Sequence, residues 1–277
     1  DPWLVGRVAA ENALSDLFAK GVAPRLALAV VTVPDDADPE ETPEPEKTAA
    51  APSNSAAALP FDFPAAKPPG PAGRFLLVPS RESLDKATPE SSTMIYYGAT
   101  LVEPGPSESR VQSLAGTDFS MPNALMISIR TDEKAQVGDV LLGHWESGSG
   151  MRRAVVTGGT PDAPVVHYLV DSIDGPGKAD EDTFKTNRFN RLTGPAQVGT
   201  TVACKDGSDM KHGVMTAIRE GRLIMSGFAS RVNAYDAKDC VAIPPKAEFA
   251  AGDNVHVPVL GTYRMGTVSS VDSTLLR

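Results

Sequence analysis

The stretch VGDVLLGHWESGSGMRRAVV, residues 137–156, carries the pattern that decides the fold of this chain. A glycine leads into a short apolar run and a turn follows. A basic residue then precedes a small residue and a second apolar run. Short apolar runs bounded by Gly, Pro and Ser are typical of β-strands joined by turns. The stretch therefore predicts two strands connected by a turn.

The same pattern recurs twice downstream, as VGTTVACKDGSDMKHGVMTAI from residue 198 and as AGDNVHVPVLGTYRMGTVSSV from residue 251. Units about 50 to 60 residues apart fit small five-stranded barrels in tandem. We therefore predict a mainly β fold whose parts are a β-rich lead-in over 74–135, a first repeat over 136–197, a second over 198–247 and a truncated third over 248–277.

The acidity of the chain is concentrated in one segment. Residues 35–73 carry eight acids and two bases, which accounts for a net −6 of the chain's −9, and they contain nine Pro and ten Ala. Such a segment cannot bury enough apolar surface to offset the entropy of ordering it. We predict a disordered acidic linker there, and we interpret its LPFDFP island, residues 59–64, as a solvated kink, with a short docking motif as the alternative.

Composition also bears on partners and compartment. The longest apolar run, LALAVV over 26–31, is far shorter than the roughly 20 residues that span a bilayer, so we expect no membrane partner. The acidic balance disfavours nucleic acid. The sequence shows no signal peptide, and this does not fix the compartment if the chain starts upstream. Among compartments a cytoplasmic location is favoured, and the oligomeric state stays open. Cys204 and Cys240 are expected to be reduced core residues, with a disulfide across one small barrel as the alternative.

The first 34 residues begin DPWLVGRVAAENALSDLFAKGVAPRLAL and resemble the selenide, water dikinases (selenophosphate synthetases) of the aminoimidazole-ribonucleotide-synthetase-like superfamily. By this resemblance Asp16 matches a magnesium-binding aspartate, and Asn12 matches an asparagine one helical turn earlier; both belong to the ATP-binding domain. The family's catalytic Cys and Lys, a second acidic pair and a glycine-rich segment do not appear in this chain. We therefore expect no phosphoryl transfer and no cofactor, with ATP and Mg²⁺ as the alternative. Both ends look cut, so we expect a fragment or an erroneous gene model.

The repeats look like SH3-like or Tudor-like barrels in their pattern. Tudor-type modules often hold methylated Lys or Arg in an aromatic cage by cation–π attraction. The candidate cage residues are Trp145 with Tyr168 in the first repeat, Phe228 and Tyr235 in the second, and Tyr263 in the third; packing is the alternative role of each. We predict a non-catalytic binding protein that recognises a protein or a modified peptide. The alternative is a fragment of a selenide, water dikinase, which makes selenophosphate from ATP.

Three further patterns invite a chemical interpretation. GSGMRR, residues 148–153, lacks the GK[ST] of a phosphate loop and predicts a hairpin turn ending in two exposed arginines. KTNRFNR, residues 185–191, mixes bases with Phe as single-strand binders do, but the acids before it favour a solvated loop between barrels. His144, His167, His212 and His256 share no ligand spacing, so a metal site is unsupported.

Overall fold

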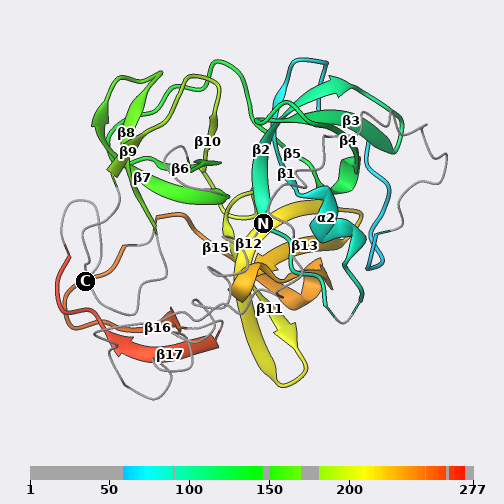
Figure 1. The fold of residues 1–277 in the computed structure, drawn as a ribbon. Helices are drawn as coiled ribbons and strands as arrows, with labels where there is room; N and C mark the ends of the chain where they lie inside the picture. Colours follow the sequence, from blue (N-terminus) through cyan, green and yellow to red (C-terminus); the bar gives the residue numbers. More distant parts are fainter. Residues whose placement is uncertain are drawn as a thin grey trace, which may run out of the picture. The chain divides into compact units, whose positions relative to one another are not determined.

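The computed structural model describes residues 59–89, 91–145, 150–169, 181–246, 248–259 and 262–271, and this part of the chain is mainly β. It contains three five-stranded antiparallel sheets and one two-stranded sheet (Figure 1). This confirms the predicted mainly β class. Residues 1–58, with Asn12 and Asp16, lie outside the described residues.

The strands follow the chain from sheet to sheet. The first sheet contains β1 (Phe75–Pro79), β2 (Tyr96–Glu103), β3 (Glu108–Ser113), β4 (Asp118–Pro122) and β5 (Ile127–Ser128). The second contains β6 (Val140–His144), β7 (Met151–Gly159), β8 (Pro164–Tyr168), β9 (Glu181–Thr183) and β10 (Phe189–Arg191). The third contains β11 (Thr201–Asp206), β12 (Asp209–Arg219), β13 (Arg222–Gly227), β14 (Val232–Asp236) and β15 (Cys240–Ile243). The two-stranded sheet pairs β16 (Asn254–Val259) with β17 (Thr262–Thr267).

The three large sheets share one strand order. Four strands follow one another as a meander, and the fifth returns to pair with the first, as β5 does with β1, β10 with β6 and β15 with β11. A 3-10 turn precedes the last strand in the first and third sheets: η1 (Asn123–Leu125) and η3 (Ala237–Asp239). Residues 74–135, which we expected as a lead-in, thus form a sheet of the same order as the two that follow.

The described helical elements are short. Helix α2 (Arg81–Asp85) is inserted between β1 and β2, and its N-terminus is capped by Ser80, whose hydroxyl accepts a hydrogen bond from the N–H of Ser83. The third 3-10 element, η2 (Phe228–Ser230), joins β13 to β14. None of these elements is long or apolar enough to cross a membrane.

Each sheet, and the β16–β17 hairpin, is preceded by the same glycine turn. The four glycines have left-handed backbones, with φ of 84°, 84°, 101° and 96° at Gly73, Gly138, Gly199 and Gly252. Their N–H groups donate, over 2.7 to 2.8 Å, to the carbonyls of Leu101, Val156, Met215 and Val268. In each of the three large sheets, a β-bulge begins at the residue whose carbonyl accepts this hydrogen bond: Leu101, Val156 or Met215. Because glycine adopts positive φ without steric cost, the repeated glycine marks the start of each unit.

The Gly138 turn allows a direct test of this requirement. A Cβ atom at Gly138 meets no atom within 4 Å, so the strain in Gly138→Ala comes from the backbone alone. We expect this substitution to lower the free energy of unfolding by about 1–2 kcal/mol, measured by urea denaturation. Gly158→Ala, at another open position but without left-handed φ, is the matched control. An equal loss in both variants would contradict the assignment.

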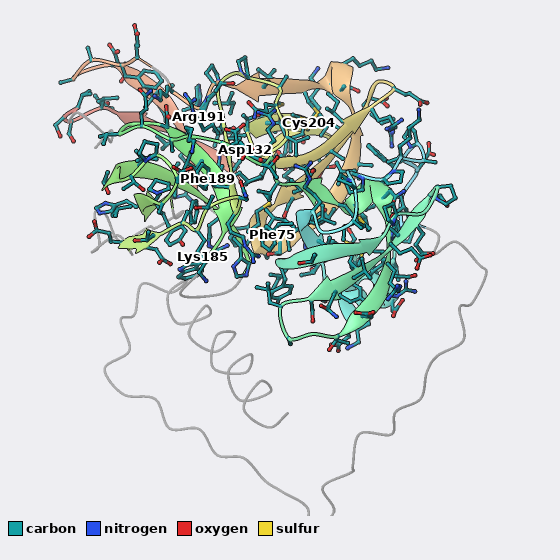
Figure 2. The ribbon with its side chains drawn as sticks, turned by 90° about the horizontal axis from the view of Figure 1, so that it is seen from above. Phe75, Asp132, Lys185, Phe189, Arg191 and Cys204 are labelled. Carbon is teal, nitrogen blue, oxygen red and sulfur yellow. A yellow bond between two sulfur atoms is a disulfide. The ribbon has the colours of Figure 1, made fainter. Side chains whose placement is uncertain are left out.

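The main hydrophobic core joins the three large sheets. Leu76 and Leu77 of β1 are fully buried and belong to one cluster with Leu142 of β6 and Ile224 of β13. The second sheet has a further core that contains Phe189, labelled in Figure 2. Its ring stacks on that of Phe184, with centroids 6.2 Å apart. A third, smaller core lies inside the third sheet. The sheets are therefore packed on shared apolar surface.

The predicted disordered linker is corrected over its last part. Phe63 is buried in the main core, and Leu59, Phe61 and Ala66 pack against it. The buried Asn123 side chain donates to the carbonyl of Ala66 over 3.1 Å. The LPFDFP island is therefore a docked segment and not a solvated kink, because its two phenylalanines and its leucine find apolar partners in the main core. The rest of the predicted linker lies outside the described residues.

The predicted solvated loop at KTNRFNR is also wrong. Its last three residues form β10, and Phe189 is fully buried, so its ring cannot stack on a base. Asn190 is buried as well and links two sheets: its Nδ2 donates to the carbonyl of Ser128 over 2.8 Å, and its Oδ1 accepts from the N–H of Arg130 over 2.7 Å.

The cysteines are joined, contrary to our expectation of two reduced thiols. Cys204 on β11 and Cys240 on β15 are direct cross-strand partners with Cα atoms 4.0 Å apart, and they form a disulfide. The physical reason is the return of the fifth strand to the first, which places the two positions opposite each other although 36 residues separate them.

Candidate functional site

The candidate site is a depression of about 290 Å³ on the third sheet, between the β11–β12 hairpin and the loop that joins β13 to β14. We call it the Phe228 depression. Its walls include the side chains of Asp206, Met225, Phe228, Arg231 and Tyr235. Backbone pairing fixes β11 against β12 and β13 against β14. The site is therefore formed by the two connections between these paired strands, which are held by a rigid sheet.

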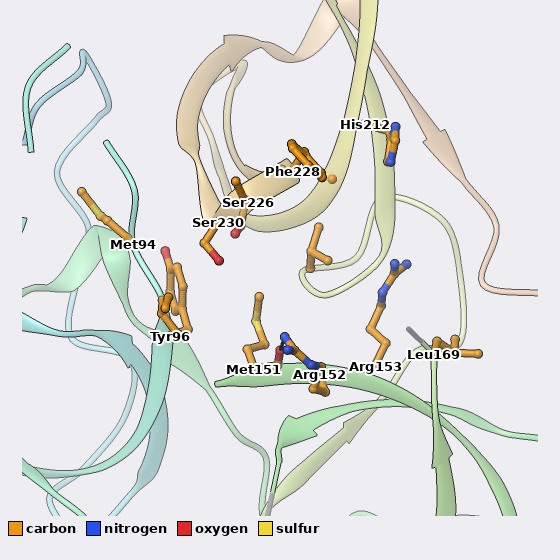
Figure 3. A pocket seen from close by; sticks show the side chains of 15 residues that line it. Met94, Tyr96, Met151, Arg152, Arg153, Leu169, His212, Ser226, Phe228 and Ser230 are labelled. Atoms are coloured by element: carbon orange, nitrogen blue, oxygen red, sulfur yellow. Dashed lines mark hydrogen bonds between the residues drawn. The ribbon is translucent and has the colours of Figure 1, made fainter. Parts of the chain in front are cut away.

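The loop that carries Phe228 has a strained backbone. Ala229 and Ser230 are consecutive residues with φ of 55° and 57°, a left-handed conformation that costs a non-glycine residue roughly 1 kcal/mol or more. The segment that precedes β2 holds this conformation, because the N–H of Met94 donates to the carbonyl of Ser230 over 2.8 Å. As a consequence the Phe228 side chain is 55% exposed, an uncommon position for so large an apolar group. Figure 3 shows this loop and the residues around it.

Tyr235 and Asp206 define the polar side of the depression. Burial raises the pKa of the half-buried Tyr235, and the negative charge of Asp206 raises it further. The phenol is therefore neutral at physiological pH. Asp206 is the one carboxylate among the described residues that line the depression, and Lys211 and Arg231 line it as cations. The site thus offers an apolar aromatic surface with charges of both signs.

The structure brings three of the five predicted aromatic residues near one another. Phe228 and Tyr235 line the depression together, and Tyr263 of β17 lies against His212, which lines it too, with ring centroids 5.1 Å apart. Asp206 was not predicted from the sequence. Its one local signal is the tight DGSD turn that closes the β11–β12 hairpin.

Trp145 and Tyr168 form a separate pair on the second sheet. Their ring centroids are 5.5 Å apart, and the Arg152 guanidinium lies 5.0 Å from the centre of the Trp145 ring. Tyr168 is buried, and its hydroxyl donates to Asp182 over 3.0 Å. The structure thus brings together the two rings that we predicted to pair. Their contacts are packing and a cation–π contact within the protein.

Within the described ranges, no group of three or more His, Cys, Asp or Glu side chains is placed to hold a metal ion. No protein-family model matches the chain, and no curated protein matches it. The resemblances to selenide, water dikinases and to Tudor-like barrels therefore stay predictions.

Proposed function

We propose that the chain is a non-catalytic binding protein, built of tandem SH3-like (Tudor-like) barrels, which recognises a protein or peptide segment at the Phe228 depression. Support for the barrels comes from the repeated strand order, because a meander whose fifth strand returns to the first is the connectivity that a small five-stranded barrel needs. The repeated glycine turns and bulges add to this support.

The observation that carries the proposal is the exposure of Phe228 on a strained, anchored loop. Rigid aromatic side chains bury large area at low entropic cost, and they carry much of the binding energy in protein interfaces. The volume of the depression, about 290 Å³, is at or below the low end of the range of small-molecule pockets and suits a single side chain of a partner.

The charges of the depression suit a polypeptide. Asp206 beside the neutral Tyr235 favours a cationic side chain, and a methylated Lys or Arg gains cation–π attraction from the rings of Phe228 and Tyr235. Lys211 and Arg231 repel a second cation and attract an acidic neighbour in the same peptide. We expect a ligand in which a basic residue is followed or preceded by an acidic one.

Peptide titration tests this function. We would titrate the full chain with synthetic peptides of fixed Gly-Ser context that carry Lys, trimethyl-Lys, Arg or dimethyl-Arg beside a Glu, and follow binding by fluorescence anisotropy. We expect saturable binding that Phe228→Ala weakens by roughly tenfold or more, because the variant removes an aromatic anchor. Phe249→Ala changes an exposed phenylalanine outside the depression and is the matched control. Unchanged affinity in Phe228→Ala would refute the site.

A further inference from the structure

A cavity of about 260 Å³ lies between the first and second sheets. We call it the Arg188 cavity. Arg74 and Phe75 line it at the start of β1, Thr100 lines it on β2, Thr131 follows β5, and Arg188 precedes β10. The residues that line it are all different from those that line the Phe228 depression, so the two sites are separate.

Arg188 is held over an aromatic ring. The Cζ atom of its guanidinium lies 3.7 Å from the centre of the ring of Phe75, which is buried and labelled in Figure 2. Gly98 of β2 makes room for this ring, because a Cβ atom there would lie 2.7 Å from Phe75 Cζ. A guanidinium that stacks through its face keeps its N–H donors at the edge of its plane. The stack therefore orients Arg188 and leaves its edge for hydrogen bonds.

Arg74 brings a second guanidinium to the same cavity. Its Nη1 donates to the carbonyl of Ile129 over 3.2 Å, and both Arg74 and Arg188 are half-buried. A guanidinium carries five N–H donors and remains protonated in proteins. One hydrogen bond to a carbonyl thus positions Arg74 without using its capacity to bind an anion.

Neutral donors line the rest of the cavity. Thr100 and Thr131 contribute hydroxyls, and Asn187 contributes an amide. The Asn187 Oδ1 atom accepts a hydrogen bond from the N–H of Asp132 over 2.8 Å, so the group that remains on this amide is its Nδ2 donor. The cavity therefore combines charged and neutral donors.

The neighbouring acids do not line the cavity. Glu133 is paired with Arg130, with Nη1 and Oε1 atoms 3.1 Å apart, and Asp162 is paired with Lys134. Asp132 is exposed, and no carboxylate belongs to the lining among the described residues. The formal charge of the whole chain is −9, so a lining whose charges are two guanidinium groups runs against the overall balance.

The arginines of GSGMRR, which we predicted to be exposed at the end of a hairpin turn, do not form a comparable site. Arg152 and Arg153 are half-buried because residues of the first and third sheets surround them. Their guanidinium groups are engaged within the protein, that of Arg152 with the Trp145 ring and that of Arg153 with the hydroxyl of Thr201.

We propose that the Arg188 cavity binds an oxyanion of the phosphate class, held by the guanidinium groups of Arg74 and Arg188 and by the hydroxyls of Thr100 and Thr131. Two guanidinium groups balance a charge near −2, and their fork geometry matches phosphate oxygens better than a point charge does. Arg188 belongs to the KTNRFNR motif, and this role needs no stacking by the buried Phe189. The oxyanion is either inorganic phosphate or the phosphoryl group of a partner, and the same chemistry recognises both.

Titration of the full chain, labelled with ¹⁵N, with sodium phosphate tests the proposal by NMR. Sodium chloride and sodium acetate at matched ionic strength are the comparisons. We expect saturable shifts with a dissociation constant of about 1 mM or below, largest at the backbone amides of Gly73, Thr131 and Asn187. Absence of saturation would overturn the proposal, and acetate that binds as tightly as phosphate would overturn the assignment to the phosphate class.

A second arm identifies the source of the oxyanion. It uses a Gly-Ser peptide with one phosphoserine and no Lys or Arg, together with its unphosphorylated counterpart. Neither peptide carries the basic residue that we expect the Phe228 depression to bind, so failure of that function leaves this test intact. Tighter binding of the phosphopeptide than of inorganic phosphate assigns the site to a phosphorylated partner. The reverse order assigns it to free phosphate.

Four variants locate the binding. Arg188→Gln should weaken phosphate binding by roughly 30-fold, and Arg188→Lys, which keeps the charge but loses the fork, by less. Thr100→Val keeps shape and charge and should weaken binding by roughly tenfold. Arg264→Gln, an exposed change on β17, is the control for lost charge and should leave the affinity unchanged.

Circular dichroism without phosphate shows whether each variant folds, and Thr100→Val decides the matter if Arg188→Gln does not fold. Unchanged affinity in a folded Arg188→Gln variant, or equal weakening in the Arg264 variant, would refute the site.

Discussion

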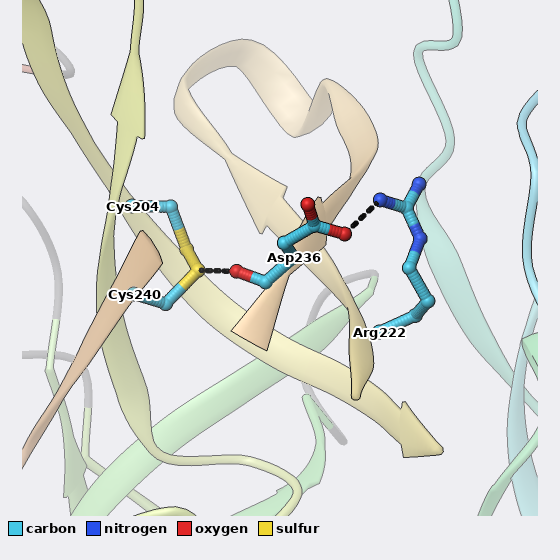
Figure 4. The surroundings of a disulfide bond; sticks show 4 residues. All are labelled: Cys204, Arg222, Asp236 and Cys240. Carbon is cyan, nitrogen blue, oxygen red and sulfur yellow. Dashed lines mark hydrogen bonds and ion pairs between the residues drawn. A yellow bond between two sulfur atoms is a disulfide. The ribbon is translucent and has the colours of Figure 1, made fainter. Parts of the chain in front are cut away.

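Replacing Cys204 and Cys240 with alanine is expected to lower the free energy of unfolding by roughly 4 kcal/mol. The disulfide closes a loop with a sequence separation of 36 residues, and the entropy of the unfolded chain that such a cross-link removes amounts to about 4 kcal/mol. Figure 4 shows the bond between β11 and β15, beside the Arg222–Asp236 ion pair, whose Nη1 and Oδ1 atoms are 2.7 Å apart. The cross-link therefore fastens the fifth strand of the third sheet to its first strand.

Guanidinium denaturation with and without dithiothreitol measures this effect. The unaltered chain should lose stability on reduction, and the double-alanine variant should be insensitive to the reductant. Cys204 is fully buried, so its replacement also changes packing. Comparing the oxidised and reduced forms of the unaltered chain measures the contribution of the cross-link without that change. Full reduction shown by mass spectrometry, without any loss of stability, would contradict the predicted contribution.

Asn190→Ala is expected to lower the free energy of unfolding by about 2–4 kcal/mol. The variant removes the partners of the Arg130 N–H and the Ser128 carbonyl, which the Asn190 amide joins across the boundary between the first and second sheets. A buried backbone group left without its partner costs about 1–3 kcal/mol. Few single polar residues outside the core clusters should have so large an effect.

The control for this prediction is Asn254→Ala. Asn254 is exposed and accepts one hydrogen bond, from the hydroxyl of Thr267, so its loss should cost about 0.5 kcal/mol or less. Chemical denaturation followed by circular dichroism measures both variants. Equal losses in the two would show that the Asn190 bridge contributes little to the packing of the sheets.

Local patterns predicted the hairpins because their determinants lie close together in the sequence. The Asp206-to-Asp209 turn lies inside the second predicted repeat and connects β11 to β12 as expected. The Glu220–Gly221 turn, whose two residues have φ of 49° and 77°, was not predicted. Such turns fix the register of their neighbours. The first sheet escaped the repeat pattern because α2 and the residues around it separate β1 from β2, which lengthens the spacing between the glycine turn and its acceptor.

The sequence identified aromatic residues of the candidate site, such as Phe228 and Tyr235, but it did not predict which of them would lie together. An aromatic side chain in a β protein is a core residue or a surface residue according to the face it occupies. Phe189 is fully buried although its neighbours in the sequence are polar, whereas Phe228 is 55% exposed between a glycine and an alanine. Phe228 is exposed on a loop whose next two residues are left-handed, and the segment before β2 anchors the second of them, Ser230, by a backbone hydrogen bond. That anchor pairs the stretch around Met94 with a loop more than 130 residues away.

The sequence by itself determined the β class, and the leading glycine and the first hairpin of each of the three predicted repeats, since these depend on residues near one another in the chain. The tertiary structure alone decided that residues 74–135 form an equivalent sheet, that the two cysteines meet, and that LPFDFP docks. Each of these depends on where a distant strand returns. The free energy of that return comes from apolar surface shared between sheets, which no local pattern encodes.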